Sequence, residues 1–246
     1  MGNKKWVLVT AGSRGIGAAI VKELVRQDYH VVFTYKNNSA LAAVLMHSLN
    51  VNHEVCWCYP CDVASVESVK ALSETLRKNH GTPYAIINNA GITKDALSFT
   101  MSLDDWLDVI NTNLNSLFYL NHCLLNEMLM QRDGCIININ SVAGLRGNVG
   151  QANYSASKSA QYGFTKTLAR EVGNFNIRVN CIAPGPVQTD MLSALPEKAV
   201  SQLVKMTPLR KLGQPEDVAL MVAFLLGRGG KHITGQTFVI DGGLSI

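Results

Sequence analysis

Short apolar runs rich in β-branched residues alternate along the chain with longer stretches in which apolar residues recur every three to four positions. The short runs predict buried strands, and the longer stretches predict amphipathic helices. Regular alternation of the two is typical of a parallel sheet with crossover helices. The expected strands are KWVLVTA (5–11), HVVFTY (30–35), HEVCWCY (53–59), YAIINNA (84–90), GCIININS (134–141), IRVNCIAP (177–184) and QTFVID (236–241).

Helices are expected between these strands, and both faces of the sheet should be covered. The pattern therefore predicts an α/β fold: a Rossmann fold with a doubly wound, seven-stranded parallel sheet, whose ligands bind at the carboxyl ends of the strands. No linker, repeat or low-complexity segment divides the chain, so residues 1–246 are interpreted as a single domain. The expected helices span 15–27, 39–49, 64–79, 103–130, 153–173 and 215–227.

Composition narrows the class of protein further. The chain is 47% hydrophobic, and its net charge of +4 is spread along the sequence. This pattern argues against a nucleic-acid-binding stripe and against a polybasic membrane patch. No apolar run approaches ~20 residues, and the first residues show neither a signal peptide nor a transit pattern. We therefore expect a cytoplasmic protein with no membrane or nucleic-acid partner.

Three of the six cysteines form a compact group, Cys56, Cys58 and Cys61 in CWCYPC. A zinc site needs a fourth ligand at suitable spacing, and His53 is the sole candidate nearby. Small buried thiols are common core residues of cytosolic proteins. We interpret the cysteines as reduced structural thiols and expect no metal.

The turn VTAGSRGIG lies between the first expected strand and the first expected helix, where phosphate groups bind. A G-x-G-x-x-G pattern begun at Gly12 meets Arg14 at its middle glycine. A T-G-x-x-x-G-x-G pattern fits Thr10 and its last two glycines but meets Ala11 at its first glycine. If Ala11 has a negative φ, its Cβ costs little, and we expect a working phosphate site.

Charges after the second strand indicate which dinucleotide binds. TYKNN lacks the acidic residue that would hydrogen-bond a ribose 2′-hydroxyl and offers Lys36, while Arg14 lies in the glycine turn. Two cations attract a 2′-phosphate, so we predict NADP(H); the alternative is that Lys36 is an ordinary solvated lysine. Asp62 with Val63 is placed to meet an adenine edge, and the small residues of NNAG allow close approach of the backbone to the cofactor.

Candidate chemistry lies on the helix expected at 153–173. Tyr154 and Lys158 are four residues apart, so the ammonium group should lie beside the phenol and favour its ionised form. Tyr162 and Lys166 repeat this spacing about 12 Å further along the helix axis, away from the strand ends. Tyr162 is therefore interpreted as a packing or interface residue.

Two further polar residues favour Tyr154 as the reactive tyrosine. Ser141 ends the fifth expected strand, and its hydroxyl can hydrogen-bond a substrate carbonyl oxygen. Asn113 lies within a long apolar helix, where a side-chain amide needs a partner. A water that joins Asn113 to Lys158 would supply this partner and a route for protons.

These motifs occur in the order T-x-x-x-x-G-x-G, NNAG, NTNLNS, Ser141, YSASK and IAPGPVQTDM. Over essentially its full length the chain resembles the short-chain dehydrogenase/reductase family. NNAGITKD, GNVGQANYSASK and ITGQTFVIDGGL resemble most closely those members that reduce 3-oxoacyl groups on acyl carrier protein. The resemblance implies a catalytic tetrad of Asn113, Ser141, Tyr154 and Lys158. The expected cofactor residues are Thr10, Gly12, Ser13, Arg14, Gly15, Ile16, Gly17, Tyr35, Lys36, Asp62, Val63, Asn89, Ala90, Gly91, Tyr154, Lys158, Pro184, Gly185, Val187 and Thr189.

The implied activity is NADPH-dependent reduction of a 3-oxoacyl thioester on acyl carrier protein to the 3-hydroxyacyl thioester, in fatty-acid or related acyl-chain biosynthesis. Alternatives are a related oxidoreductase acting on acetoacetyl-CoA, a polyketide-type chain or another ketone or secondary alcohol, and a non-catalytic NADP-binding scaffold.

The resemblance also implies a homotetramer. We expect residues 187–212 to form a mobile substrate lid that orders on binding. Arg132 matches one of two basic residues expected to meet an acidic carrier protein beside the active-site entrance, and Phe175 stands where the second is expected. The alternative is that Arg132 is a solvated residue favoured at a helix end by the helix dipole.

Overall fold

The computed structural model describes residues 4–193 and 196–246, which contain one seven-stranded sheet. All strands are parallel and lie in the order β3-β2-β1-β4-β5-β6-β7. Each overlaps a strand expected from the hydrophobic pattern, so the predicted sheet is confirmed. Their bounds are β1 Trp6–Val9, β2 His30–Tyr35, β3 Cys56–Pro60, β4 Ala85–Asn88, β5 Gly134–Ile139, β6 Ile177–Pro184 and β7 Thr237–Ile240.

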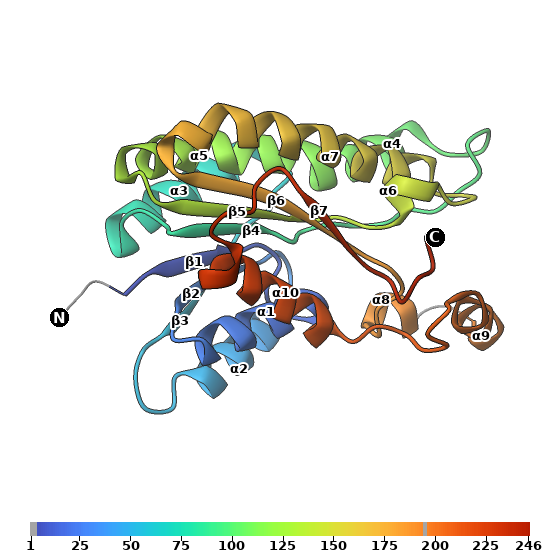
Figure 1. Ribbon diagram of the computed structural model, residues 1–246, viewed down its shortest axis with the longest axis horizontal. Helices are drawn as coiled ribbons and strands as arrows, with labels where there is room; N and C mark the ends of the chain where they lie inside the picture. Colours follow the sequence, from blue (N-terminus) through green and yellow to red (C-terminus); the bar gives the residue numbers. More distant parts are fainter. Residues whose placement is uncertain (1–3, 194–195) are drawn as a thin grey trace.

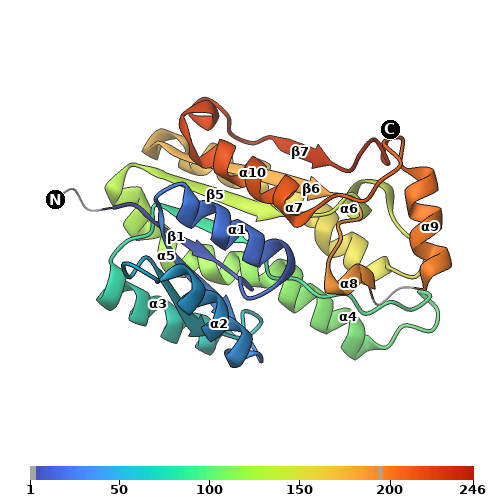
Figure 2. The same ribbon diagram turned by 90° about the horizontal axis from the view of Figure 1, so that it is seen from below.

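Helices cover both faces of the sheet, which confirms the doubly wound α/β fold (Figures 1 and 2). One layer contains α1 (Gly15–Arg26), α2 (Ser39–Leu49) and α10 (Pro215–Leu226). The other contains α3 (Val66–His80), α4 (Leu103–Ile110), α5 (Ser116–Gln131) and α7 (Ala152–Val172).

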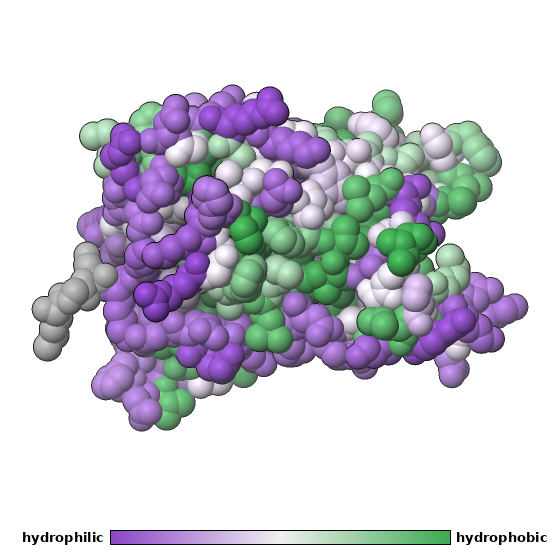
Figure 3. All heavy atoms as spheres, in the orientation of Figure 1, coloured by the Kyte–Doolittle hydropathy of each residue, from purple (hydrophilic) through white to green (hydrophobic). Residues whose placement is uncertain are grey.

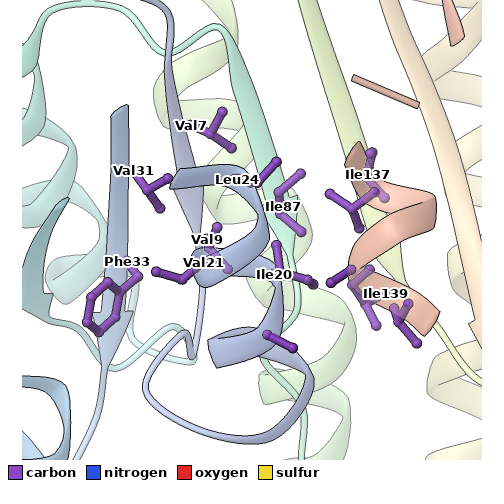
Figure 4. Close-up of a cluster of buried hydrophobic side chains, with 14 of the residues drawn as sticks. Val7, Val9, Ile20, Val21, Leu24, Val31, Phe33, Ile87, Ile137 and Ile139 are labelled. Atoms are coloured by element: carbon purple, nitrogen blue, oxygen red, sulfur yellow. The ribbon is translucent and has the colours of Figure 1, made fainter. Parts of the chain in front are cut away.

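Two hydrophobic clusters, one on each side of the sheet, hold the layers together. Because side chains of a strand point alternately to its two faces, Val7 and Val9 of β1 pack with Ile20 and Leu24 of α1 (Figure 4). Leu8, between them, packs in the other cluster. Strands buried on both faces explain why the sequence shows continuous apolar runs instead of alternation.

The carboxyl ends of the strands form the edge at which ligands are expected to bind. The chain crosses from β1 to β2 in one direction and from β4 to β5 in the other, so the loops after β1 and β4 diverge and leave a crevice between them. Three short helices lie at this end, opposite the N-terminus: α6 (Ala143–Arg146), α8 (Asp190–Ser193) and α9 (Glu197–Met206) (Figure 1). The predicted lid, 187–212, contains α8 and α9, and its residues 194 and 195 lie outside the described residues.

The prediction of one continuous helix at 103–130 is wrong, because the segment is interrupted. A π-helical turn at Asn111–Asn115 separates α4 from α5. Such wide turns often mark functional sites, and here the turn contains the buried Asn113, whose side chain and carbonyl oxygen both have partners outside the helix. Hydrophobic periodicity does not distinguish this turn from a helix, because a π-helical turn changes the backbone hydrogen bonding and not the composition.

Within the part of the chain that the structure describes, no helix is long and apolar enough to cross a membrane. The same residues contain no group of three or more His, Cys, Asp or Glu side chains arranged to hold a metal ion. All six cysteines are free thiols, and burial raises the pKa of Cys56 to about 12, so this thiol stays protonated at neutral pH.

Candidate active site

The predicted site residues gather at the carboxyl edge of the sheet. Each belongs to the end of a strand, to the loop that follows it, or to a helix whose end faces that edge. In strand order these are Thr10 to Gly17 after β1, Tyr35 and Lys36 at the end of β2, Asp62 and Val63 after β3, Asn89 to Gly91 after β4, Ser141 after β5, and Pro184, Gly185, Val187 and Thr189 at the end of β6.

The glycine turn departs from expectation at Ala11. Its φ is +51°, in the left-handed region, so the expected negative φ is wrong. Neighbouring hydrogen bonds hold the turn in this shape, because the Ala11 N–H donates to Thr34 Oγ1 and Asn89 Nδ2 donates to the Ala11 carbonyl. An alanine in this conformation costs roughly 1–2 kcal/mol, a cost that glycine avoids.

Replacing Ala11 by glycine is therefore expected to stabilise the protein. Glycine removes the backbone strain at position 11 but has greater conformational freedom in the unfolded chain, which offsets part of the gain. We expect the free energy of unfolding to rise by about 0.5–1 kcal/mol. For a chain of this length that gain raises Tm by about 1–4 °C, measurable by thermal unfolding. Ala18→Gly, the same exchange inside α1, should lower Tm. An Ala11→Gly protein that melts at or below the wild-type temperature would contradict the strain.

The start of α1 differs from the starts of α2, α3 and α4 in its capping. The side chains of Asn38, Ser65 and Ser102 cap α2, α3 and α4, whereas Arg14, at the N-cap of α1, makes no side-chain cap. The first backbone N–H groups of α1 therefore face the loop without a side-chain partner, as in helices that bind anions. A Cβ at Gly17 would lie 2.3 Å from the Ala11 carbonyl oxygen, so only glycine permits this tight turn.

Both candidate phosphate-binding cations reach carboxylates at this edge. Lys36 Nζ lies 2.7 Å from Asp62 Oδ2, and Arg14 lies 3.9 Å from Asp190 at the start of α8. Lys36, which is more than half exposed, is thus paired with the residue predicted to meet the adenine edge. The pair places a cation next to the end of β2, where the resemblance expects the 2′-phosphate.

Ser141 and Tyr154 line one pocket of about 310 Å³. Ile16, Val187 and Thr189, all predicted from the sequence to contact the cofactor, line the same pocket. The Ser141 hydroxyl accepts a hydrogen bond from the Ala143 N–H at 3.1 Å. The same hydroxyl is hydrogen-bonded to the Tyr154 side chain, so the two groups can meet one oxygen atom in the pocket.

The protonation of Tyr154 differs from the expectation. Burial raises the pKa of Tyr154 above its usual value, and a hydrogen bond with the Ser141 side chain partly opposes that shift. Lys158 Nζ lies 5.7 Å from the centre of the Tyr154 ring and donates to the Ile139 carbonyl at 2.8 Å. The predicted lowering of the Tyr154 pKa by Lys158 is therefore wrong for this geometry. A phenol that keeps its proton at neutral pH is equipped to act as an acid.

Lys158 is a buried cation, 3% exposed, on the same helix as Tyr154. Because burial disfavours the charged form, the pKa of Lys158 falls to about 8. Its ammonium group lies close to the loop after β4, since a Cβ at Gly91 would be 3.6 Å from Nζ. Glycine at position 91 therefore keeps open the space in front of Lys158.

Asn113 has all its partners within the protein. Its Oδ1 accepts from the Ile92 N–H at 2.8 Å, and its Nδ2 donates to the Ile92 carbonyl and to Ser157 Oγ. The side chain therefore ties the loop after β4 to α7, and the water that the sequence analysis assigned as its partner is not required.

Three residues that complete this network were not singled out from the sequence. Asn140 Nδ2 donates to the Lys158 carbonyl at 2.9 Å, and Gln161 Nε2 donates to the Asn113 carbonyl at 2.6 Å. Ser157 Oγ accepts a hydrogen bond from Asn113 Nδ2. The available signal was a polar stripe at helical spacing on α7, since Ser157, Gln161 and Thr165 are all buried.

Arg132 does not lie at the entrance of the pocket in the same protomer. Arg132 precedes β5 whereas Ser141 follows it, so the two residues are at opposite edges of the sheet. Its guanidinium donates to the Asn174 carbonyl at 2.7 Å and lies over the Phe175 ring. Phe175 follows the C-terminal end of α7, a helix of 21 residues, whereas Tyr154 lies near its N-terminal end. At a rise of about 1.5 Å per residue, the helix separates the two residues by roughly 25 Å or more.

Comparison with known proteins shows what the chain is similar to over its length. A family model described as Enoyl-(Acyl carrier protein) reductase matches residues 10–245. The 3-oxoacyl-[acyl-carrier-protein] reductase FabG of Pseudomonas aeruginosa is 45% identical over 240 residues, which cover 98% of this chain and 97% of the relative. The protein of the same name from Chlamydia trachomatis is 40% identical over 242 residues, with coverages of 98% and 97%. That from Staphylococcus epidermidis is 38% identical over 240 residues and 98% of each chain.

Proposed function

This chain belongs to the short-chain dehydrogenase/reductase family, and we propose that it reduces the 3-oxo group of an acyl thioester on acyl carrier protein, with NADPH as the reductant. Membership of the family implies an oxidoreductase with a nicotinamide cofactor. The observation that carries the proposal is the pocket in which Ser141 and a protonated Tyr154 face the residues predicted to hold the nicotinamide. The names of the full-length relatives support the substrate.

The residues present fit such a cofactor. The uncapped start of α1 and the tight approach at Gly17 suit a pyrophosphate group, and Arg14 with Lys36 supplies positive charge for a 2′-phosphate. Gly91 leaves room in front of Lys158. The nicotinamide end would be held by Ile16, Val187 and Thr189, which line the pocket beside Tyr154.

When bound, the reduced nicotinamide supplies a hydride to the 3-carbonyl carbon. Tyr154 gives its phenolic proton to the oxygen, so the C=O bond becomes CH–OH and a phenolate remains. Ser141 donates a hydrogen bond that orients the carbonyl and stabilises the charge that develops on its oxygen. The ammonium of Lys158 lies in front of Gly91, where it would contact the cofactor, while Asn113 holds the loop after β4 against α7.

Rates on matched substrates test this proposal. We expect kcat/KM with NADPH to be highest for acetoacetyl-acyl-carrier protein, lower for acetoacetyl-CoA and lowest for a simple ketone such as ethyl acetoacetate. Oxidation of NADPH is followed by absorbance, and the 3-hydroxy product by mass spectrometry. A preference for the CoA ester or the simple ketone would assign the enzyme to a related oxidoreductase. A lack of turnover on all three would contradict the reductase activity.

We also propose that Arg132 contributes to carrier docking, on the condition that the carrier serves the pocket of a neighbouring protomer. Arg132, the C-cap of α5, contacts the segment after α7, whereas Tyr154 lies near the start of α7. A carrier bound at Arg132 can therefore deliver its acyl group only to a neighbouring protomer. The docking proposal therefore requires an oligomer, as the resemblance implies. Exposed apolar side chains suit subunit contacts on α4 and α5 (Leu103, Leu107 and Phe118) and around α10 and β7 (Leu220, Phe224 and Val239). Figure 3 shows apolar surface across the middle of the face on which β7 lies.

Replacing Arg132 by alanine tests the docking role. The variant should reduce the carrier-bound thioester about 3- to 10-fold less efficiently and with a flatter salt dependence, because one charge at the interface is lost. Reduction of the N-acetylcysteamine thioester, too short to reach this surface, should be unchanged. An unaltered rate and salt dependence on the carrier substrate, or a monomer in light scattering at micromolar concentration, would contradict docking at Arg132.

A further inference from the structure

Tyr162 lies two helical turns beyond Tyr154 on α7, and its predicted placement away from the strand ends is wrong. Its hydroxyl donates a hydrogen bond of 2.8 Å to the backbone carbonyl of Ser141. The side chain is half-buried, so the contact is partly shielded from water. A tyrosine outside the predicted tetrad thus contacts the residue that carries the tetrad's serine hydroxyl.

The Tyr162 contact is one of three that fix the Ser141 segment to α7. Asn140 Nδ2 donates to the Lys158 carbonyl, and Asn140 Oδ1 accepts from the Ser141 N–H at 2.7 Å. Gly144, in α6, lies so close to α7 that a Cβ there would be 2.7 Å from the Lys158 carbonyl carbon. Because Tyr154 and Lys158 both belong to α7, these contacts set the position of Ser141 relative to both.

Of these three contacts, that of Tyr162 is the one made to the backbone of Ser141 itself. The Ser141 carbonyl has two hydrogen-bond donors, the Gly144 N–H within the same turn at 3.1 Å and the Tyr162 hydroxyl from α7. The Gly144 bond is internal to the loop and cannot fix its distance from α7. Without the Tyr162 hydroxyl, the Ser141 peptide keeps its local turn but loses its direct bond to the helix that carries Tyr154.

The Tyr162 phenol remains a donor throughout the neutral pH range. Burial raises the pKa of Tyr162, and nearby Cys181 and Tyr154 reinforce the shift. Tyr162 therefore does not exchange protons with the pocket at neutral pH. Its hydroxyl keeps its hydrogen bond to the Ser141 carbonyl.

We propose that Tyr162 is a positioning residue, which holds the Ser141 hydroxyl at the distance from Tyr154 that carbonyl reduction requires. The proposal rests on the proposed role of Ser141, but not on which acyl carrier delivers the substrate. Small displacements of a hydrogen-bond donor weaken transition-state stabilisation more than they weaken binding.

Removing the hydroxyl alone tests the proposal. Tyr162→Phe should lower kcat about 3- to 10-fold on the carbonyl substrate that the wild-type enzyme reduces fastest, as expected for loss of about one hydrogen bond. KM for NADPH should not change. Tyr84→Phe is a matched control, because the half-buried Tyr84 hydroxyl also donates to a backbone carbonyl, that of Leu226, away from the pocket. The control should retain wild-type kcat.

A double-mutant cycle separates positioning from general stability. If Tyr162 acts through Ser141, Tyr162→Phe should have no further effect on kcat when Ser141 is already alanine. Equal fractional losses in the two backgrounds, or a Tyr162→Phe kcat equal to wild type, would overturn the proposal. Either result leaves the reductase function intact provided that Ser141→Ala itself loses activity. An active enzyme unaffected by Ser141→Ala would instead contradict the proposed function of the site.

Discussion

Replacing Tyr154 by phenylalanine is expected to lower kcat at least ~100-fold, because general acid catalysis typically contributes factors of this order. The change removes one oxygen atom and leaves the aromatic ring that packs in the pocket. Binding of NADPH should therefore persist, which fluorescence titration measures independently of turnover. Steady-state reduction of acetoacetyl-acyl-carrier protein gives the kcat.

The control for this experiment is the phenylalanine exchange at a second tyrosine. Tyr84→Phe should retain wild-type turnover, and Tyr162→Phe should lose no more than about one tenth as much as Tyr154→Phe, since one hydrogen bond contributes roughly 1 kcal/mol. Equal losses from Tyr154→Phe and Tyr162→Phe would contradict the choice of Tyr154 as the proton donor. Loss of NADPH binding together with turnover would indicate a structural role for its hydroxyl.

Removing both cations at the adenosine end should change cofactor preference. The combined variant Arg14→Ala and Lys36→Ala is expected to raise KM for NADPH by about 30-fold or more, because charge-assisted bonds to a phosphate contribute roughly 1.5–3 kcal/mol each. KM for NADH should change by less than about threefold, since NADH lacks the 2′-phosphate. Initial rates over a range of each cofactor give both constants.

A charge-matched control excludes a general effect of net charge. Lys4 and Arg26 form ion pairs with Asp28 and Glu23, outside the predicted cofactor residues, and replacing both by alanine removes the same charge. That variant should keep the wild-type preference. A wild-type enzyme that works faster with NADH than with NADPH at equal concentration would contradict the assignment of NADP(H).

The fold followed from the sequence because its strongest signal is periodic. All seven strands and the long helices come from the hydrophobic pattern, and residues after each strand must lie at the carboxyl edge. Ser141 and Tyr154 could be placed together for that reason. The positions of polar residues within the pattern, such as Asn113, pointed to the site because burial of an amide requires a partner.

The errors arose where backbone geometry or a long side chain decided the outcome. The sign of φ at Ala11 depends on contacts from Thr34 and Asn89, which are distant in sequence. Tyr162 was placed from its Cα position alone, whereas its side chain reaches back to the Ser141 carbonyl. For Tyr154, burial outweighs the nearby cation, a balance that helical spacing does not reveal.

Arg132 shows the limit of transferring a residue by motif. Its place in MQRDG matched the resemblance, but Arg132 precedes β5 and Ser141 follows it, so the two lie at opposite ends of that strand. Its contact with Phe175 likewise joins two segments more than 40 residues apart in sequence.

The fate of the hydride tests the proposed reduction most directly. Acetoacetyl-acyl-carrier protein is incubated with the enzyme and NADPH that carries deuterium at both C4 positions, and the product is cleaved from the carrier and analysed by mass spectrometry. The proposed reaction yields a 3-hydroxybutyryl thioester with one deuterium on C3, and Tyr154→Phe yields it at least ~100-fold more slowly. A product without deuterium on C3, or conversion of crotonyl-acyl-carrier protein to the saturated thioester at a higher rate than acetoacetyl-acyl-carrier protein is reduced, would contradict it.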